Sequence, residues 1–146
     1  MSEISKKMNK NILKSIGAVL AGFLFLVVIS IATDLILIKT LLMRQPFDLN
    51  PSWLIALVIV YRSLYAIMGS YLTARLAPDK PMRLVMIGGV IGFAITIIGT
   101  IAMWDKPPHW YGIALIITAL PCAWLGGKIF LSSKKTGRYL TIKNKA

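Results

Sequence analysis

The sequence predicts an all-α integral membrane protein, a four-helix bundle of up-down-up-down topology with both termini in the cytoplasm. Its 146 residues are 57% hydrophobic and 15% charged, whereas a soluble domain has about 25% charged residues. The apolar residues form four unbroken blocks, each at or above the roughly 20 residues that cross a bilayer. Short breaks that contain proline separate the blocks. These observations exclude a cytosolic globular domain, a disordered chain and a disulfide-stapled mini-protein.

The four predicted membrane-spanning segments are residues 16–42, 53–77, 84–104 and 110–131. Basic tails flank them over residues 1–15 and 132–146. Each connection contains two prolines, which end helices, namely Pro46 and Pro51, Pro78 and Pro81, and Pro107 and Pro108. Connections this short join antiparallel neighbours. A closed barrel needs alternating apolar and polar residues, and residues 85–93 do not alternate.

The first segment has an alternative interpretation as a cleaved signal peptide, because a basic start and an apolar stretch precede the small-residue sequence Ser30-Ile31-Ala32. However, that stretch is longer than the usual apolar region of about 7 to 15 residues. Apolar sequence also resumes at once through Leu42. We therefore expect the first segment to be retained as a helix.

Small residues repeat at helical spacing in the later segments, which predicts close packing, because lipid provides no hydrophobic drive between helices. The repeats are Gly88, Gly92, Thr96 and Gly99 in the third segment and Ala114, Thr118, Cys122 and Gly126 in the fourth. Gly69 belongs to a similar face of the second segment. We expect the third and fourth segments to pack as a tight hairpin. Such faces serve packing within the chain or contact with a second copy, and the sequence leaves both open.

Pro121 lies inside the fourth segment and cannot donate a hydrogen bond to the carbonyl of Ile117, which predicts a kinked helix. A kink beside Cys122 marks either a hinge or a helix that bends around its neighbours. The second case is the commoner one, and the sequence does not separate them.

Basic residues fall mainly in the N-terminal tail, the second connection and the C-terminal tail. Because basic loops stay in the cytoplasm, both termini are expected there. Trp53, Trp104, Trp110 and Tyr111 lie at the predicted outer boundary, where amphipathic rings prefer to lie. The formal net charge of +12 is then explained by topology and by contact of the tails with anionic lipid, and not by nucleic-acid binding.

Two charged residues, Asp34 and Arg62, lie well inside the segments. Asp34 is nine residues before Met43 and Arg62 is ten after Ser52, so at 1.5 Å per residue both lie about 13 to 15 Å below the outer helix ends. An unpaired charge at that depth costs about 3 to more than 10 kcal/mol, which predicts an ion pair between the two helices. Candidate polar neighbours of this pair are Ser30, Tyr61 and Tyr65.

The Asp34–Arg62 pair has two interpretations. It is either a device that fixes the register of the first two helices or a functional site within the membrane. The structural role is favoured, because a permanent arginine partner keeps Asp34 ionised, whereas a proton-coupled transporter needs a carboxylate whose protonation changes.

No residue spacing supports catalysis or a metal centre. His109 is the single histidine and Cys122 the single cysteine. Cys122 has no histidine in its own segment to act as a base, and His109 belongs to no recognisable set of metal ligands. We therefore expect a protein that is not an enzyme and that holds no cofactor or metal.

Three motifs characterise the second to fourth segments: GSYLTARLAP at residues 69–78, Trp104-Asp105, and LPCAWLGG at residues 120–127. With these motifs the chain resembles small four-span bacterial membrane proteins of uncharacterised function. The resemblance implies a bacterial inner-membrane location and carries no activity or site residue. Small multidrug transporters also have four spans, but they are shorter and place a glutamate midway along the first helix, whereas Asp34 lies nearer the outer end.

The sequence therefore favours a non-enzymatic scaffold or accessory subunit that packs with itself or with a larger membrane complex. The alternative is a small homodimeric transporter in which Asp34 and Arg62 form a polar site. Transport predicts that Asp34 faces a water-filled cavity, whereas a scaffold predicts a dry and fully packed pair.

Overall fold

The computed structural model of the chain describes residues 2–44 and 49–143, and these residues form helices and connections with no strand. The helices are α1 (Ser2–Lys39), α2 (Ser52–Leu76), α3 (Pro81–Ala102) and α4 (His109–Lys143). Each of the four is long and apolar enough to cross a membrane. The all-α prediction is thus confirmed for the described residues, and the helices fit a multi-pass membrane protein.

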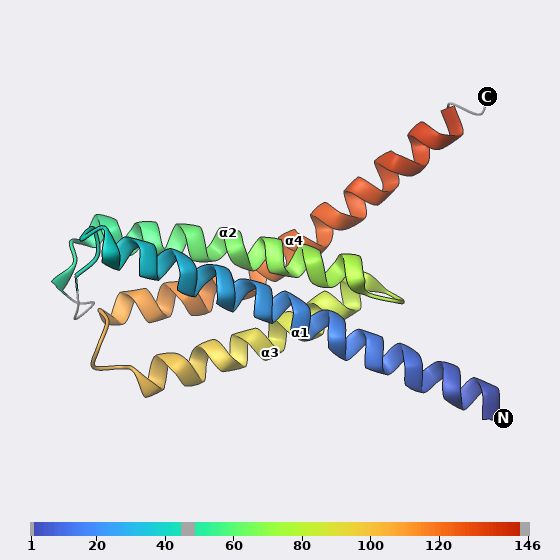
Figure 1. Ribbon diagram of the computed structural model, residues 1–146, viewed down its shortest axis with the longest axis horizontal. Helices are drawn as coiled ribbons and strands as arrows, with labels where there is room; N and C mark the ends of the chain where they lie inside the picture. The colour runs from blue at the N-terminus through green and yellow to red at the C-terminus, as the bar shows by residue number, and fades with distance from the viewer. Residues whose placement is uncertain (1, 45–48, 144–146) are drawn as a thin grey trace.

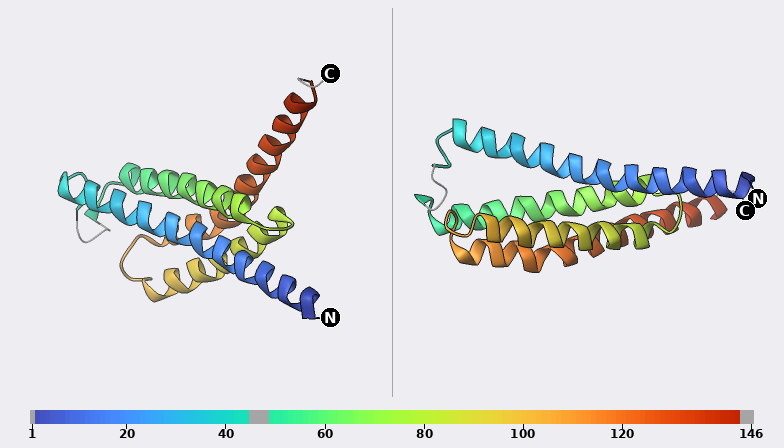
Figure 2. Two further views of the ribbon diagram at one scale, coloured as in Figure 1. Left: turned by 45° about the vertical axis from the view of Figure 1, so that its right-hand side comes forward. Right: turned by 90° about the horizontal axis from the view of Figure 1, so that it is seen from below.

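The helices lie side by side, and the chain reverses direction at each connection, so both termini lie at the same end of the molecule (Figure 1). We call this end the terminal end and the opposite one the far end. Helix α2 packs against α4 and α1, and α4 packs against α3, whereas α1 makes few contacts with α3. In the right-hand view of Figure 2 the ribbon of α1 diverges from the other helices toward the far end, where Leu37 and Ile38 still pack against the buried cluster that contains Leu54, Ile55 and Val58.

Two helices are longer than the predicted spans. Helix α1 begins at Ser2 instead of near residue 16, and α4 continues to Lys143 instead of ending near residue 131. Much of each predicted tail is therefore helical, and both extensions project beyond the bundle (Figure 1). The reason is local, because residues 2–15 and 132–143 contain no proline and are rich in lysine, which favours helix. Residues 1 and 144–146 of the tails lie outside the described residues.

The connections are held by a few polar contacts. In the connection between α1 and α2, the amide nitrogen of Arg44 donates to Asn50 Oδ1 at 2.8 Å, and Asn50 Nδ2 donates to the Arg44 carbonyl at 2.9 Å. At the terminal end, Asn11 Nδ2 of α1 donates to Asp79 Oδ2 in the connection between α2 and α3 at 3.0 Å. Pro81 begins α3, where its missing N–H costs no hydrogen bond.

Three glycine contacts set the spacing between helices. A Cβ on Gly69 of α2 would lie 2.9 Å from the carbonyl oxygen of Gly22 of α1, and a Cβ on Gly126 of α4 would lie 2.5 Å from the carbonyl oxygen of Ile67 of α2. A Cβ on Gly89 of α3 would lie 2.7 Å from Ala123 Cβ of α4. The helix axes approach this closely only because these residues have no side chain.

The predicted small face of α3 is therefore displaced by one residue. Gly89 packs on α4, whereas Gly88 and Gly92 face Val19 and Phe23 of α1. A Cβ on Gly99 would have no described atom outside its own helix segment within 4 Å, so Gly99 contributes no helix contact in this part of the chain. Neighbouring positions differ by about 100° around a helix, so adjacent glycines face different partners.

Pro121 lies within the continuous helix α4, and α4 changes direction along its length (Figure 1). A proline in a helix interior removes one backbone hydrogen bond and bends the axis. The bend agrees with the predicted kink, and a hinge at this position stays a prediction.

Candidate functional site

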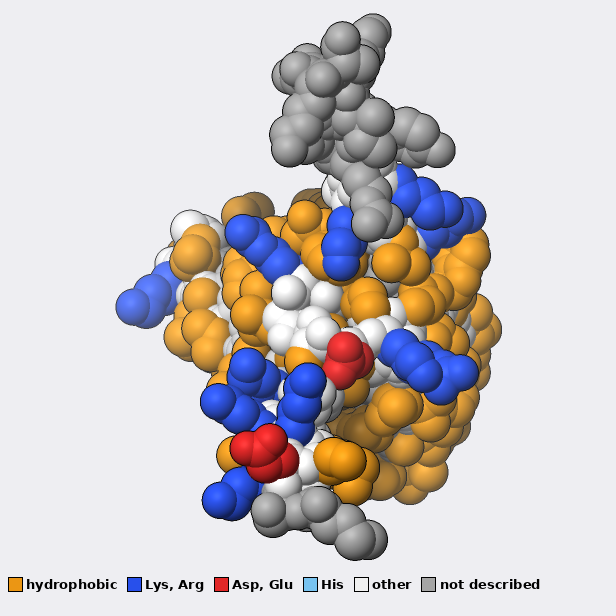
Figure 3. Space-filling model, turned by 90° about the vertical axis from the view of Figure 1, so that its right-hand side faces the viewer, with side chains coloured by type: hydrophobic (Ala, Val, Ile, Leu, Met, Phe, Trp, Pro, Cys, Tyr) orange, Lys and Arg blue, Asp and Glu red, His pale blue; other side chains and the backbone are white. Residues whose placement is uncertain are grey.

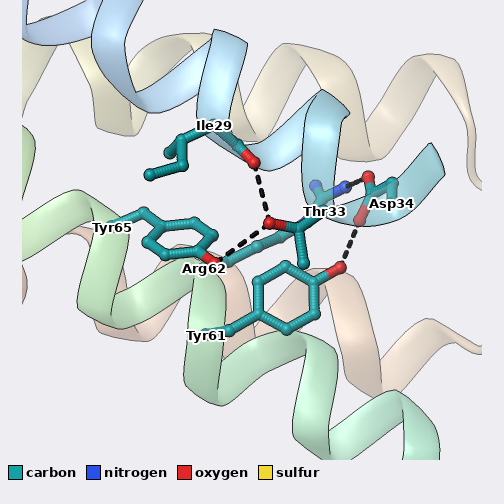
Figure 4. Close-up of polar contacts among 6 residues, drawn as sticks. All are labelled: Ile29, Thr33, Asp34, Tyr61, Arg62 and Tyr65. Atoms are coloured by element: carbon teal, nitrogen blue, oxygen red, sulfur yellow. Dashed lines mark hydrogen bonds and ion pairs between the residues drawn. The ribbon is translucent and has the colours of Figure 1, made fainter. Parts of the chain in front are cut away.

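The structure brings Asp34 of α1 and Arg62 of α2 together as an ion pair. Arg62 Nη2 lies 2.6 Å from Asp34 Oδ2, and the hydroxyl of Tyr61 donates to Asp34 Oδ1 (Figure 4). Both carboxylate oxygens therefore accept a hydrogen bond. The side chains of Arg62 and Asp34 retain 37% and 25% of their exposure, so the pair is not sealed by packing.

Tyr65 lies beside the pair and contacts a different partner from the one expected. Its hydroxyl is 3.0 Å from Thr33 Oγ1, and Thr33 Oγ1 itself donates to the carbonyl of Ile29 at 2.9 Å. A hydroxyl has one proton, so Tyr65 must be the donor in the bond with Thr33. Sequence reasoning missed Thr33, although a hydroxyl next to Asp34 on a membrane helix is the kind of residue that forms contacts between helices.

Ser30 lies one helical turn before Asp34, as predicted, but it does not bind the carboxylate. Ser30 is 8% exposed, and its Oγ and Arg62 Nε are buried atoms that find no hydrogen-bond partner among the described residues. An unpaired polar group buried in an apolar environment costs roughly 1 to 3 kcal/mol by mutational measurement. These two atoms are therefore the unsatisfied polar groups of the site.

Asp34, Arg62 and Ser30 line a cavity of about 290 Å³ together with Ser63, Thr118 and Cys122. A second cavity of about 230 Å³ lies nearer the terminal end, where Gly69, Gly88 and Gly92 contribute to its walls. Five residues line both cavities, namely Leu26, Val27, Ala66, Thr96 and Ala119. The two cavities are thus parts of one groove inside the bundle.

The predicted packing residues consequently divide into three groups. Gly126 and Gly69 lie at close helix contacts, and Gly69, Gly88 and Gly92 line the 230 Å³ cavity. Thr118 and Cys122 line the 290 Å³ cavity beside the ion pair. Gly99 belongs to none of these three groups. Some small residues permit close helix contact, and others line open space. Their spacing in the sequence does not show which role a given residue has.

The two ends of the molecule differ in charge. Lysine and arginine side chains surround the terminal end (Figure 3), and the described lysines of the N-terminal part of α1 are exposed. At the far end, the rings of Trp104 and His109 meet edge to face, with centroids 4.5 Å apart.

Within the described ranges, no three His, Cys, Asp or Glu residues lie close enough to hold a metal ion.

Removal of the Tyr61 hydroxyl is expected to destabilise the protein more than removal of the Tyr65 hydroxyl. Tyr61→Phe removes a hydrogen bond to a charged group, which contributes about 1.5 to 3 kcal/mol, whereas Tyr65→Phe removes one between neutral hydroxyls, which contributes about 0.5 to 1.5 kcal/mol. The free energy of unfolding in mixed micelles measures both losses, with each tyrosine serving as the control for the other. Equal losses would contradict the assignment of Tyr61 to the carboxylate.

Comparison with known proteins gives the chain no relatives: no protein-family model, curated protein or solved structure matches it.

Proposed function

We propose that this chain is a small multi-pass membrane transporter that binds its ligand at the Asp34–Arg62 pair. The observation that carries this proposal is the cavity of about 290 Å³ on which both charged side chains lie. A pair that only fixed helix register would be expected in dry, close packing, with its remaining donors satisfied. Instead, the pair borders open space, and Arg62 Nε and Ser30 Oγ have no partner in the described part of the chain, so the hydrogen-bonding capacity of the site is not used up by packing.

A scaffold or accessory subunit is the second candidate function, because extensive apolar surface is exposed on all four helices. Lipid alone accounts for that surface in a membrane protein. The exposed apolar surface therefore supports a scaffold function less specifically than the polar cavity supports transport. Neither candidate requires a catalytic residue, a cofactor or a nucleic acid, and we propose that the protein is not an enzyme. Assembly as a homodimer is part of the transport proposal.

The proposed location is the bacterial cytoplasmic membrane, with both termini in the cytoplasm. The motifs at residues 69–78 and 120–127 support the bacterial assignment by resemblance. The basic residues gathered at the terminal end (Figure 3) support the orientation, because basic segments remain cytoplasmic and are attracted to anionic lipid.

Cys122 provides a direct test, because it is the single cysteine of the chain and lines the same cavity as Asp34 and Arg62. If the cavity is hydrated, a small charged thiosulfonate added to vesicles that contain the protein should modify Cys122. Mass spectrometry of the intact protein measures the extent of modification with time.

The matched control is Val90→Cys in a Cys122→Ser background, because Val90 lies near the middle of α3 and is 55% exposed on the outside of the bundle. A lipid-facing thiol at this depth should react slowly with a charged reagent. If Cys122 reacts no faster than this control, the cavity is dry and the scaffold function is favoured instead.

A further inference from the structure

The groove inside the bundle has a polar part and an apolar part. The polar part is the 290 Å³ cavity with Asp34 and Arg62. The apolar part is the 230 Å³ cavity, whose walls include Val19, Phe23 and Val85. Each volume is close to the lower end of the range of about 300 to 1,000 Å³ for small-molecule sites. A ligand that fills both parts must itself be amphipathic.

The groove is open toward the bilayer between α1 and α3. These two helices make few contacts with each other. Val27 and Ile31 of α1 and Ile95 of α3 line the groove, and they are also 45%, 53% and 56% exposed on the surface of the bundle. Residues that face both the groove and the surface mark its opening. An apolar molecule dissolved in the membrane can therefore enter sideways, without passing through water.

Hydrogen-bond capacity in the polar part selects the chemistry of the ligand. Both oxygens of Asp34 already accept hydrogen bonds, one from Tyr61 and one from Arg62. The donors Arg62 Nε and Ser30 Oγ, in contrast, have no partner among the residues that the structure describes. Arg62 Nε can only donate and Ser30 Oγ can donate, so the site suits a hydrogen-bond acceptor. A cation would add an uncompensated positive charge beside the neutral ion pair, which is costly in a low-dielectric environment.

The net charge of the site restricts the class of ligand further. Asp34 and Arg62 neutralise each other within the ion pair. A bound anion would leave one uncompensated negative charge in a low-dielectric environment, which is costly. An uncharged acceptor such as a carbonyl oxygen satisfies the two donors without that cost.

Two glycines of α3, Gly88 and Gly92, form part of the wall of the apolar part. A Cβ on Gly88 would lie 3.5 Å from Val19, and one on Gly92 would lie 3.2 Å from Phe23. Larger side chains at these positions would press on Val19 and Phe23 and narrow the cavity that all four residues line. Their absence leaves an apolar channel that begins beside the ion pair and is suited to a hydrocarbon chain.

We propose that the groove binds an uncharged, single-chain amphiphile whose carbonyl oxygen accepts hydrogen bonds from Arg62 Nε and Ser30 Oγ and whose chain lies along Gly88 and Gly92. The ligand enters from the bilayer between α1 and α3. This inference rests on the proposed function and names the substrate class of the same site.

The test compares four probes of matched chain length in vesicles that contain the full chain: methyl laurate, laurate, dodecyltrimethylammonium and dodecane. Each is added before the membrane-permeant reagent N-ethylmaleimide, and the rate of Cys122 alkylation is measured. Methyl laurate should slow alkylation and raise the Tm of the protein, because a ligand that binds the native state stabilises it. At equal concentration, dodecyltrimethylammonium, laurate and dodecane should slow alkylation less and raise the Tm less.

Two substitutions test the two parts of the groove separately. Ser30→Ala removes an oxygen that has no partner in the described part of the chain, so it should not lower the Tm of the ligand-free protein. It should weaken protection by methyl laurate about fivefold, the effect of one lost hydrogen bond. Gly88→Val should block the apolar part and abolish protection. The control is Ser52→Ala, an exposed serine at the start of α2, which should leave protection unchanged.

The outcomes separate this inference from the proposed function. If the charged thiosulfonate reaches Cys122 but methyl laurate neither protects it nor raises the Tm, the substrate class is wrong and the hydrated polar site stands. Equal protection by the cation, or full protection in Ser30→Ala, also overturns the inference. If Cys122 is unreachable by the charged reagent and no probe changes the Tm, both proposals fail.

Discussion

Arg62→Gln is expected to lower the free energy of unfolding by about 3 to 5 kcal/mol, the usual loss when one partner of a buried ion pair is removed. The carboxylate of Asp34 would keep Tyr61 as its only described donor and would lose its counter-ion. Because the Asp34 side chain is 25% exposed, the lower end of that range is expected. Denaturant titration in mixed micelles and the amount of protein in the membrane measure the effect.

The double substitution Asp34→Asn with Arg62→Gln shows whether the loss belongs to the pair. Each single change leaves one charge unpaired, whereas the double change leaves none, so stability should largely return. A double-mutant cycle gives the coupling free energy. Arg75→Gln is the matched control, because Arg75 is exposed at the end of the same helix and its loss should change stability little. Additive losses in the cycle would show that the two charges do not depend on each other.

The same double variant separates structural from functional roles of the pair. It should fold like the parent but fail to bind methyl laurate, because Arg62 Nε is no longer available as a donor. If stability recovers and protection of Cys122 persists, the pair is a structural element only. The register of α1 and α2 would then be its principal role.

Gly126→Ala is expected to lower the free energy of unfolding by about 1 to 3 kcal/mol, the usual cost of overpacking. The added Cβ would lie 2.5 Å from the carbonyl oxygen of Ile67 and 2.6 Å from Ser70 Cβ. Since the first of these atoms belongs to the backbone of α2, it cannot turn aside, and α4 must move away from α2. Denaturant titration in mixed micelles measures the loss, and Gly126→Val should increase it.

Gly99→Ala is the control for the Gly126 substitution. A Cβ on Gly99 would have no described atom outside its own helix segment within 4 Å, so the change brings only the higher helix propensity of alanine, up to about 1 kcal/mol. The two substitutions should therefore change stability in opposite directions. A loss of equal size at Gly99 would mean that the small face of α3 meets a partner, such as a second copy of the chain.

Helix positions were predictable from the sequence because hydropathy and proline act locally. The cores of α2 and α3 lie within a few residues of the predicted spans. The extensions of α1 and α4 were not predicted, because hydropathy marks the part of a helix that fits a bilayer and not where the helix ends. Lysine favours helix as well as water, so a basic tail continues the helix.

The equal depth of Asp34 and Arg62 was also predictable, because the rise per residue of an α-helix is constant. The polar neighbours that each residue contacts were not predictable from the sequence. Tyr65 donates to Thr33 instead of the carboxylate, and Gly89, not Gly88, packs on α4. These details depend on the rotation of each helix about its axis, which is set by side chains from all its neighbours at once.

The sequence by itself therefore determined four apolar helices and the two charged residues placed at one depth. Only the tertiary structure decided that small residues beside this pair enclose a groove instead of filling the interior. The physical reason is that a cavity is a property of several helices together: α1 contacts α2 closely but α3 weakly. The resulting space leaves Ser30 Oγ and Arg62 Nε without a partner in the described chain.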